Sequence, residues 1–200
     1  SHSADNGVRM QAPTIHFQHV SMRTARLLLR PLQADDAVAL FEMYSDPRVS
    51  KYLSRRQWQS IDQAHELIAQ DAQAHATGRY LRLGIERTED AELLGECSLH
   101  NLDPPSKRAE VGYALRASAW GHGYVGEALA PLVRFAFVDL GLNRLEADTD
   151  PRNSASAKVL RRLGFTLEGV LRARWIVRGE TSDSAIYGLL RHEWHARVSR

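Results

Sequence analysis

Much of the chain consists of short apolar runs, interrupted by longer stretches in which apolar residues recur at helical spacing. These two periods predict strands and amphipathic helices, respectively. Proline and glycine mark several boundaries, since Pro31 stops the first apolar run and Gly78, Gly141 and Gly164 follow helical stretches. The pattern predicts strands at 26–30, 80–87, 93–99, 110–115, 144–148, 166–177 and 184–190, and helices at 35–45, 60–78, from the turn at 120–126 to 140, and at 153–164.

The connections between these elements predict the sheet. Strands joined by short turns, as at 88–90 and 178–180, must be antiparallel. The strands at 110–115 and 144–148 are linked through a helix and are therefore expected to run parallel. The sequence predicts an α+β (mixed α/β) fold, with a mostly antiparallel sheet, one parallel strand pair and helices on both faces.

Local signals add detail to four of these segments. Ser60 and Gln63 have the spacing of a capping box, which predicts the start of the second helix. Asn153 is the expected N-cap of the helix that Gly164 ends. Pro131 lies inside the helix that ends at 140 and predicts a bend there, or a position near its first turns. The two prolines of residues 101–107 predict a loop.

The stretch from Trp120 to Leu129 is a glycine-rich turn that runs into an apolar helix. No Ser, Thr, Asp or Asn stands where a helix N-cap is expected, so the first backbone N–H groups have no side-chain partner nearby in sequence. Glycines beside such an end let a ligand approach the backbone closely. Because several N–H dipoles converge at the positive end of a helix, the turn is suited to a phosphate group.

The glycines of this turn allow more than one interpretation. Gly121, Gly123 and Gly126 match the dinucleotide-binding fingerprint, and Glu146 lies at a suitable distance to bind a ribose. Against NAD, a loop at 116–119 separates the turn from its strand, and too little chain follows for a doubly wound sheet. A phosphate-loop NTPase is disfavoured because no Gly-Lys-Ser/Thr follows. The glycines could also serve a tight turn alone.

Composition narrows the class of protein. Two hundred residues, 44% of them hydrophobic, suffice for a single domain, expected at 23–196 after a polar tail at 1–22 that could include a cloning remnant. The net charge of +2 and the scattered arginines disfavour nucleic acid as a partner. The sole cysteine, Cys97, excludes an internal disulfide and fits a reducing cytoplasm. We expect no membrane and no metal, since neither a membrane-length apolar run nor a metal-ligand spacing is present.

A resemblance to a known family rests on ordered segments at 109–115, 120–129, 143–147, 153–165 and 168–172. Together these segments resemble the acetyl-CoA-binding region of GNAT N-acetyltransferases, in particular the RimJ/RimL-like group. The resemblance covers about Thr24 to Trp194. It implies a cytoplasmic acyltransferase with a GNAT-like fold, in which the strand at 110–115 splays away from the strand at 144–148.

The resemblance also implies where acetyl-CoA binds. The backbone amides of the turn would hold its pyrophosphate, and its pantetheine arm would lie between the splayed strands. Trp120 and Val125 depart from the general family pattern of the turn, although RimJ/RimL-like members often carry tryptophan at the first of these positions. The cofactor-binding residues implied in this way are Val111, Gly112, Tyr113, His122, Gly123, Tyr124, Val125, Gly126, Glu127, Asn153, Ser156, Lys158 and Arg162.

Acetyl transfer to an amine needs a neutral amine, a polarised thioester carbonyl and a proton for the leaving thiolate. The resemblance places Glu110 where several family members carry a glutamate as general base. Glu110 could equally be a solvated strand residue or bind the positive charge of the acceptor, and Glu96 is a second candidate base. Leu160 stands where many GNAT enzymes have an acid tyrosine. The RimJ/RimL-like resemblance implies that Ser156 is the acid instead, although Ser156 could equally be only a small polar residue of its helix.

The acceptor stays open at this point. The family acetylates the N-termini of ribosomal proteins, polyamines, antibiotics and other small amines, so either a protein N-terminal amine or a small-molecule amine is expected. The helices within 35–77 and the closing hairpin would form the acceptor site, and a homodimer is a family-level expectation. Because the usual tyrosine is absent, a catalytically silent acyl-CoA-binding or sensing domain is the alternative, followed by an NAD-dependent oxidoreductase.

Overall fold

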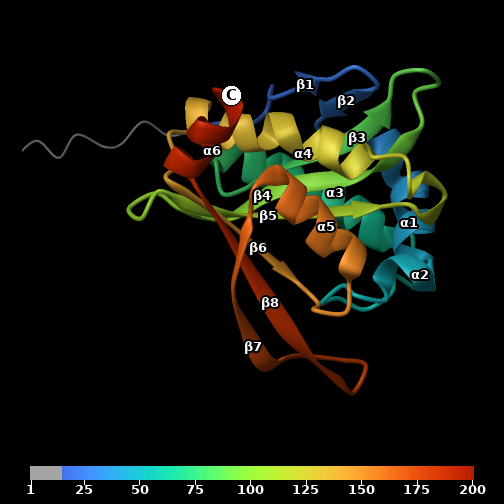
Figure 1. Ribbon diagram of the computed structural model, residues 1–200. Helices are drawn as coiled ribbons and strands as arrows, with labels where there is room; N and C mark the ends of the chain where they lie inside the picture. The colour runs from blue at the N-terminus through green and yellow to red at the C-terminus, as the bar shows by residue number, and fades with distance from the viewer. Residues whose placement is uncertain (1–14) are drawn as a thin grey trace, which may run out of the picture.

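The computed structural model describes residues 15–200, which form one sheet with helices on both faces (Figure 1). The sheet has the strand order β1-β2-β3-β4-β5-β6-β8-β7. Only β5 and β6 pair in parallel, and every other neighbouring pair is antiparallel, as the connections predict. The strands are β1 (Met22–Arg23), β2 (Leu27–Arg30), β3 (Leu81–Arg87), β4 (Leu93–Asp103), β5 (Arg108–Leu115), β6 (Arg144–Thr149), β7 (Thr166–Val177) and β8 (Glu180–Leu190).

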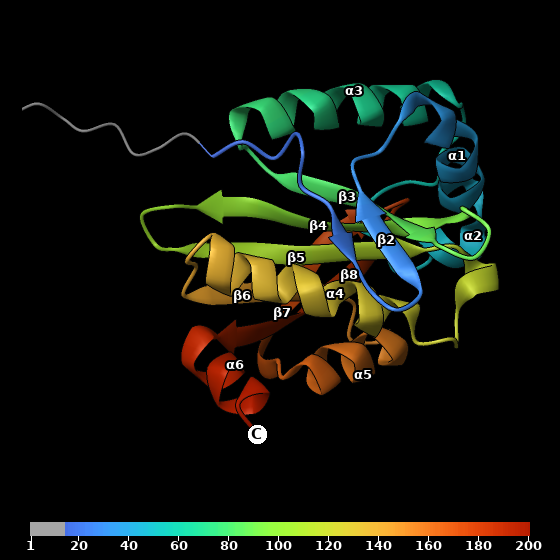
Figure 2. The ribbon, with the colours of Figure 1, turned by 90° about the horizontal axis from the view of Figure 1, so that it is seen from above.

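The helices divide between the two faces of the sheet (Figure 2). They are α1 (Ala37–Ser45), α2 (Pro47–Ser50), α3 (Asp62–Thr77), α4 (Tyr124–Arg134), α5 (Ser154–Leu163) and α6 (Arg191–Val198). On one face α1 packs against β4 and α3 against β3, whereas α4 covers β2 and β4 on the other face beside α5. Each face therefore has its own apolar core.

Each core is built from the apolar residues that recur at helical or strand spacing in the sequence. Leu129, Leu132 and Phe137 are fully buried against the strands on the α4 face. Leu40 and Tyr44 are buried in the second core, on the α1 and α3 face. Full burial of such a side chain stabilises the fold by roughly 1.5–3 kcal/mol. These contacts hold α4 firmly behind the strands whose ends form the site.

The parallel pair β5–β6 is short, and this determines the shape of the middle of the sheet. Arg108, Ala109 and Glu110 pair with residues 144–146, and the pairing then stops. Beyond that point β5 continues along β4 to Leu115, while β6 continues along β8 to Thr149. The two strands therefore splay apart, as predicted, and leave the backbone of the second half of β5 without a partner strand on one side.

Several boundaries differ from the sequence prediction, and β1 and α2 were not predicted. Most of the loop predicted at 101–107 belongs to a hairpin, because β4 runs to Asp103 and β5 begins at Arg108. After Pro131 the helix continues as α-helix only to Arg134 and then widens into a π-helical turn over Phe135–Asp139. The last strand begins at Glu180 rather than 184. Helix α6 was not predicted, because its polar sequence has no apolar period.

The capping pair at the start of α3 is present. The backbone N–H of Ser60 donates to Oε1 of Gln63 at 3.2 Å, and the N–H of Asp62 donates to Oγ of Ser60 at 3.2 Å. The helix itself begins at Asp62 and ends at Gly78, which adopts a left-handed conformation (φ 71°). Local side-chain chemistry therefore predicted both ends of this helix to within about one turn.

We expect Gly95→Ala to lower the thermal midpoint of unfolding. Gly95 pairs with Leu115 across β4 and β5, and an added Cβ would come within 2.1 Å of the Ala114 carbonyl oxygen. A backbone atom cannot move aside easily, so the cost should be about 1–3 kcal/mol. Gly169→Ala is the matched control, because a Cβ there meets no atom within 4 Å. Equal melting temperatures for the two variants would contradict this interpretation.

Candidate active site

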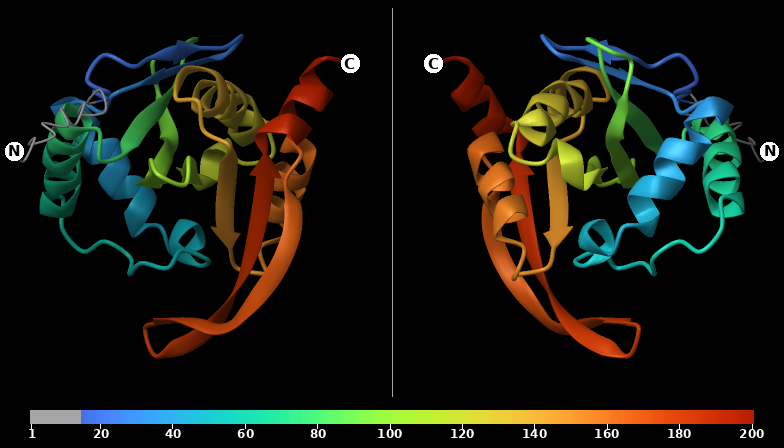
Figure 3. Two further views of the ribbon diagram at one scale, coloured as in Figure 1. Left: turned by 90° about the vertical axis from the view of Figure 1, so that its left-hand side faces the viewer. Right: turned by 90° about the vertical axis from the view of Figure 1, so that its right-hand side faces the viewer.

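A cavity of about 700 Å³ opens where β5 and β6 diverge. Its walls come from the end of α1, the segment that follows α2, the middle of α3, the start of β3, the middle of β4 and β5, the end of β6, the first turns of α5 and the β7–β8 hairpin. Figure 3 shows the hairpin projecting from the body and curving beneath the α2 region. The cavity thus lies between segments that are far apart in the sequence.

The predicted site residues fall into two groups. Glu110, the β5 segment 111–113, Asn153 and Ser156 line the cavity. The glycine-rich turn at 121–127 does not line it and lies at the N-terminus of α4 instead. Helices α4 and α5 lie alongside each other with their N-termini on the same side of the molecule (Figures 1 and 2). The turn and the cavity therefore lie at the same end of these helices.

The turn has the backbone geometry of an open anion cradle. Gly121 and Gly123 have φ angles of 79° and 78°, a left-handed conformation that glycine adopts at low cost. Gly123 is the N-cap of α4, and within residues 15–200 no side chain caps this helix end. A Cβ added at Gly121 or Gly126 would meet no atom within 4 Å. The space and the free N–H groups fit a phosphate group.

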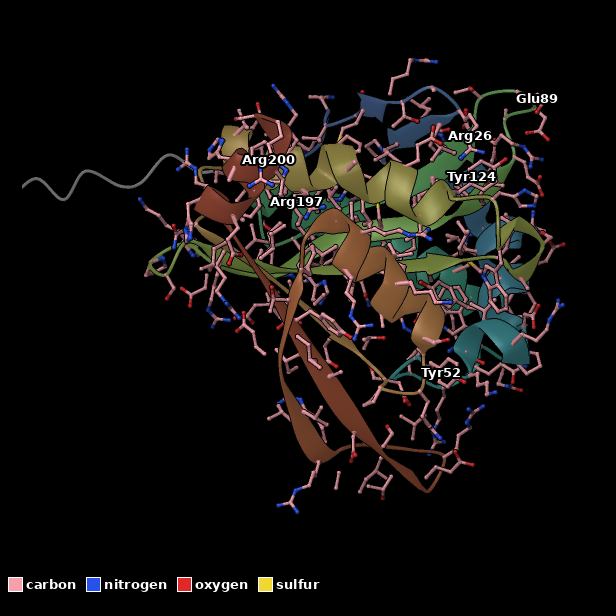
Figure 4. The ribbon with its side chains drawn as sticks, in the orientation of Figure 1. Arg26, Tyr52, Glu89, Tyr124, Arg197 and Arg200 are labelled. Carbon is pink, nitrogen blue, oxygen red and sulfur yellow. The ribbon has the colours of Figure 1, made fainter. Side chains whose placement is uncertain are left out.

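Arg26 supports the turn from outside, a contact that sequence reasoning missed. Its Nε donates to Oε2 of Glu127 at 2.7 Å, and its Nη2 donates to the His122 carbonyl oxygen at 2.9 Å. The guanidinium lies 4.4 Å from the centroid of the Tyr124 ring (Figure 4). Thr24 Oγ1 donates to the other oxygen of Glu127 at 2.6 Å. The Glu127 side chain therefore anchors the turn to the β1–β2 segment.

The charge of Glu127 agrees with this anchoring role. Burial alone would favour the neutral acid, but the hydrogen bonds from Thr24 and Arg26 outweigh it and hold the pKa of Glu127 below its usual range. No local signal marked Arg26, because it precedes Glu127 by 101 residues. Glu127 is one of the cofactor-binding residues expected from the sequence, and its side chain holds the turn in place against Thr24 and Arg26.

Glu110 is held by two polar side chains of β4. Nδ2 of Asn101 donates to its Oε1 at 3.0 Å, and Nε2 of His100 lies 3.4 Å from its Oε2. The bond with His100 is the main cause that keeps the pKa of Glu110 below its usual range, although burial works against it. His100 also contacts Ser98 through its other ring nitrogen, 3.3 Å from Oγ. A carboxylate, an imidazole and a hydroxyl therefore form a chain along one wall.

A tyrosine meets Ser156 across the cavity. The hydroxyl of Tyr113 on β5 is hydrogen-bonded to Oγ of Ser156 on α5. Oδ1 of Asn153 accepts the Ser156 N–H at 3.1 Å and so caps α5, as expected. Burial raises the pKa of Tyr113, which keeps its hydroxyl protonated. Leu160, where the usual acid tyrosine would stand, is buried.

Glu96 belongs to a buried network rather than to the open part of the cavity. Only 4% of it is exposed, and its Oε1 accepts the Tyr44 hydroxyl at 2.5 Å. Arg82 lies between Glu96 and Asp71, with Nε 3.4 Å from Oε2 of Glu96 and Nη1 3.0 Å from Oδ1 of Asp71. Burial raises the pKa of Asp71 to about 6 in spite of Arg82. This structural engagement favours Glu110 over Glu96 as the reactive carboxylate.

Comparison with known proteins decides the family. A sequence model described as an acetyltransferase (GNAT) domain matches residues 26–166, well over half of the chain. The protein belongs to the GNAT family. It is an acetyltransferase, and acetyl-CoA is the acyl donor of this family. The dinucleotide interpretation of the turn is therefore set aside.

Individual relatives of this GNAT protein are of similar length. It is 34% identical to the "Uncharacterized N-acetyltransferase p20" of Bacillus licheniformis, over 87% of this chain and 98% of the relative. It is 25% identical to the [Ribosomal protein uS5]-alanine N-acetyltransferase of Escherichia coli, over 88% and 93%. A crystal structure named "Probable acetyltransferase" is 31% identical with a TM-score of 0.81, covering 88% of this chain and 99% of that one.

Several predictions about ligands remain untested by the geometry. Lys158 and Arg162 are exposed on α5 outside the cavity, and their contact with the cofactor stays a prediction. Among residues 15–200, no three or more His, Cys, Asp or Glu side chains are grouped so as to hold a metal ion. In the same part of the chain, no helix has the length and apolar character needed to cross a membrane.

We expect Arg26→Ala to weaken acetyl-CoA binding roughly threefold to tenfold, because charge-assisted hydrogen bonds are worth about 1.5–3 kcal/mol each and part of this is recovered by water. The turn would lose its anchor through Glu127 and His122. Isothermal titration with acetyl-CoA measures the effect. Arg23→Ala is the control, since this arginine is exposed on β1. Equal dissociation constants for wild type and Arg26→Ala would contradict the anchoring role.

Proposed function

We propose that this enzyme transfers the acetyl group of acetyl-CoA directly to a primary amine that enters the cavity, either a protein N-terminal amine or a small-molecule amine. One observation carries the proposal: Glu110 and Ser156 reach the same cavity from β5 and α5, at the point where β5 and β6 separate. Acetyl-CoA supplies an activated acetyl group as a thioester. The remaining chemistry is proton transfer and positioning by this chain.

The backbone of β5 positions the thioester. From Val111 to Tyr113 the strand has β4 on one side and no partner on the other. Its free N–H and C=O groups are available to the amide groups of the pantetheine arm. An N–H in this segment also suits the thioester carbonyl oxygen, whose negative charge grows during the reaction. The glycine-rich turn supports the same orientation, because it would hold the pyrophosphate at the end of the arm.

Glu110 acts as the base in this proposal. The amine nitrogen forms a bond to the acetyl carbon, and the proton it loses passes to the carboxylate directly or through water. The lowered pKa of Glu110 keeps it ionised at neutral pH and able to accept that proton. An α-amine with a pKa of about 8 is roughly one-fifth neutral at pH 7.4, whereas a lysine amine is only about one-thousandth neutral. The help required from Glu110 therefore depends on the acceptor.

Ser156 acts as the acid. When the bond between the acetyl carbon and the sulfur breaks, the thiolate takes a proton from the Ser156 hydroxyl, and the Tyr113 hydroxyl passes its own proton to Ser156 along their hydrogen bond. Tyr113 is then reprotonated through cavity water by the proton that Glu110 took from the amine, which restores both side chains. Only 8% of Ser156 is exposed, so bulk water has little access to it. Tyr113 would thus serve in place of the tyrosine that Leu160 replaces. The predicted homodimer stays a prediction.

The test is release of free thiol from acetyl-CoA with a panel of peptides of varied N-terminus, polyamines and aminoglycosides. We expect at least one amine to be acetylated, and Glu110→Gln to lower its kcat by roughly a hundredfold. The loss should be greatest at low pH, where neutral amine is scarce. Glu110 stays ionised from pH 6 to 9. An increase of activity with pH in that range therefore reports the deprotonation of the acceptor amine.

Glu89→Gln is the matched control, because this glutamate lies exposed on the turn between β3 and β4, far from the cavity (Figure 4). Parallel pH profiles of wild type and Glu110→Gln, with equal kcat, would remove the base assignment. If acetyl-CoA binds but no amine in the panel yields thiol, the silent acyl-CoA-binding domain becomes the better description.

We expect Ser156→Ala to lower kcat by about ten- to a hundredfold and to leave the Kd of acetyl-CoA unchanged. Tyr113→Phe should lower kcat less, and the double variant should be no slower than Ser156→Ala, because both hydroxyls act in one chain. Single-turnover kinetics and titration of acetyl-CoA separate the two effects. Fully additive losses in the double variant would show that the hydroxyls act independently.

A further inference from the structure

Three cations line the α2–α3 side of the cavity. Lys51 follows α2, Arg55 lies in the segment that leads to α3, and Arg79 precedes β3. All three line the cavity together with Tyr52, which lies beside α2 (Figure 4). We call these three side chains the basic wall.

Aromatic rings position the basic wall without neutralising it. The Lys51 ammonium lies 5.1 Å from the centroid of the Tyr52 ring. The guanidinium carbon of Arg55 lies 4.8 Å from the centroid of the Tyr44 ring. Arg79 is similarly placed, 5.3 Å from the ring of Tyr80. A ring attracts a cation through its quadrupole but carries no formal negative charge.

Carboxylate partners are missing from the basic wall. Within residues 15–200, no carboxylate oxygen lies within 4.0 Å of the Lys51, Arg55 or Arg79 head groups. The three cations therefore line the cavity without a direct ion pair, and Asp71 interacts with Arg55 only at longer range.

Two other arginines of the same cavity show the contrast. Arg82 is paired with Asp71 at 3.0 Å, and Arg152 with Asp150 at 2.7 Å. Both are therefore neutralised by the chain itself. Arg178, at the tip of the β7–β8 hairpin, also lines the cavity without such a pair and adds to the positive charge near its mouth.

Negative charge gathers elsewhere in the cavity. Glu110 lies at the divergence of β5 and β6, and Asp148 lies near the end of β6 on the other side of that gap. Glu180 and Asp183 line the cavity from the hairpin, which curves beneath the α2 region. The gap where the amine must react thus carries Glu110 and Asp148, whereas the three cations lie on the α2–α3 side. A ligand complementary to this arrangement carries charges of both signs.

We propose that the acceptor is an amine that also bears an anionic group, a carboxylate or a phosphate, and that the basic wall binds this anion while the amine faces Glu110. The inference rests on the proposed function, because it concerns the acceptor of the same reaction. A polyamine would bring like charge to the basic wall, whereas an acidic amine would supply the carboxylate or phosphate partner that these cations lack. Electrostatic complementarity of this kind sets specificity among related ligands.

The test compares acceptors that differ only in charge. Tripeptides with Ala at the first position carry Asp, Asn or Lys at positions two and three, and spermidine and aminoethyl phosphate extend the series to small molecules. We expect kcat/KM for the Asp peptide to exceed that for the Asn peptide by about tenfold, with the Lys peptide and spermidine lowest. The preference should shrink at 0.5 M NaCl, where the Debye length falls to roughly half of its physiological value.

Substitutions in the basic wall test whether its cations cause the preference for the Asp peptide over the Asn peptide. Lys51→Gln, Arg55→Gln and Arg79→Gln, singly and combined, should each reduce the Asp-to-Asn ratio, and the triple variant should bring it close to one. Arg56→Gln is the matched control, because Arg56 is exposed in the same segment and does not line the cavity. It should leave the ratio as in the wild type. If the triple variant fails to fold, the three single variants still decide the matter.

The outcomes separate the two proposals. No thiol release with any amine would overturn the proposed acetyl transfer itself. Release with the Asn or Lys peptide at equal or higher kcat/KM than with the Asp peptide would overturn the anionic acceptor alone. A ratio that is unchanged in the triple variant would also overturn it. Preference for aminoethyl phosphate over the Asp peptide would identify a small molecule as the source of the anion.

Discussion

The divergence of β5 from β6 is the constraint on which the rest of the site depends. Three residue pairs hold the two strands together, and after Glu110 each strand follows a different neighbour. A sheet that pairs fully satisfies its own backbone groups, so it offers nothing to a ligand. Here the interruption creates both the cavity and a row of backbone groups that need a partner. The energetic cost of the gap is offset by the cores on the two faces, which hold the diverging strands in place.

The side chains around this gap come from elements that reach it independently. Glu110 and Tyr113 are carried by β5, Ser156 by the first turn of α5, and the basic wall by the segments around α2 and α3. Glu110, Tyr113 and Ser156 are positioned by sheet and helix, whereas the α2–α3 side of the cavity is built largely from connecting segments. Loops of this kind can change their side chains with little effect on the core. This division explains why the donor could be assigned through the family while the acceptor needed a physical argument.

Sequence reasoning succeeded where the signal was local. The uncapped turn before α4, the Ser60–Gln63 pair and the Asn153 cap all follow from residues within one helical turn, and the parallel pair follows from the connections. The acid and base candidates and the acyl donor came from a resemblance, which the family match supports for the donor. The boundaries of β4 and β5 were missed because a hairpin of polar residues lacks an apolar period.

What sequence reasoning could not find were contacts between distant segments. His100 reaches Glu110 only because β4 and β5 pair in one register, and Tyr113 reaches Ser156 across 43 residues. Register and helix placement are tertiary quantities, set by both cores rather than by neighbouring residues. The same holds for the cations of the basic wall, whose lack of partners becomes visible only once the positions of all carboxylates are known.

The tie between Arg26 and Glu127 also bears on the order in which the protein can assemble. It joins two segments 101 residues apart, and closing a loop of that length costs conformational entropy that only a formed core can repay. The turn can therefore become rigid only after β2 has docked beside β3 and α4 has packed behind it. If the turn holds the pyrophosphate, as proposed above, a half-folded chain lacks a tight site for the cofactor, and retention of coenzyme A is coupled to completion of the fold.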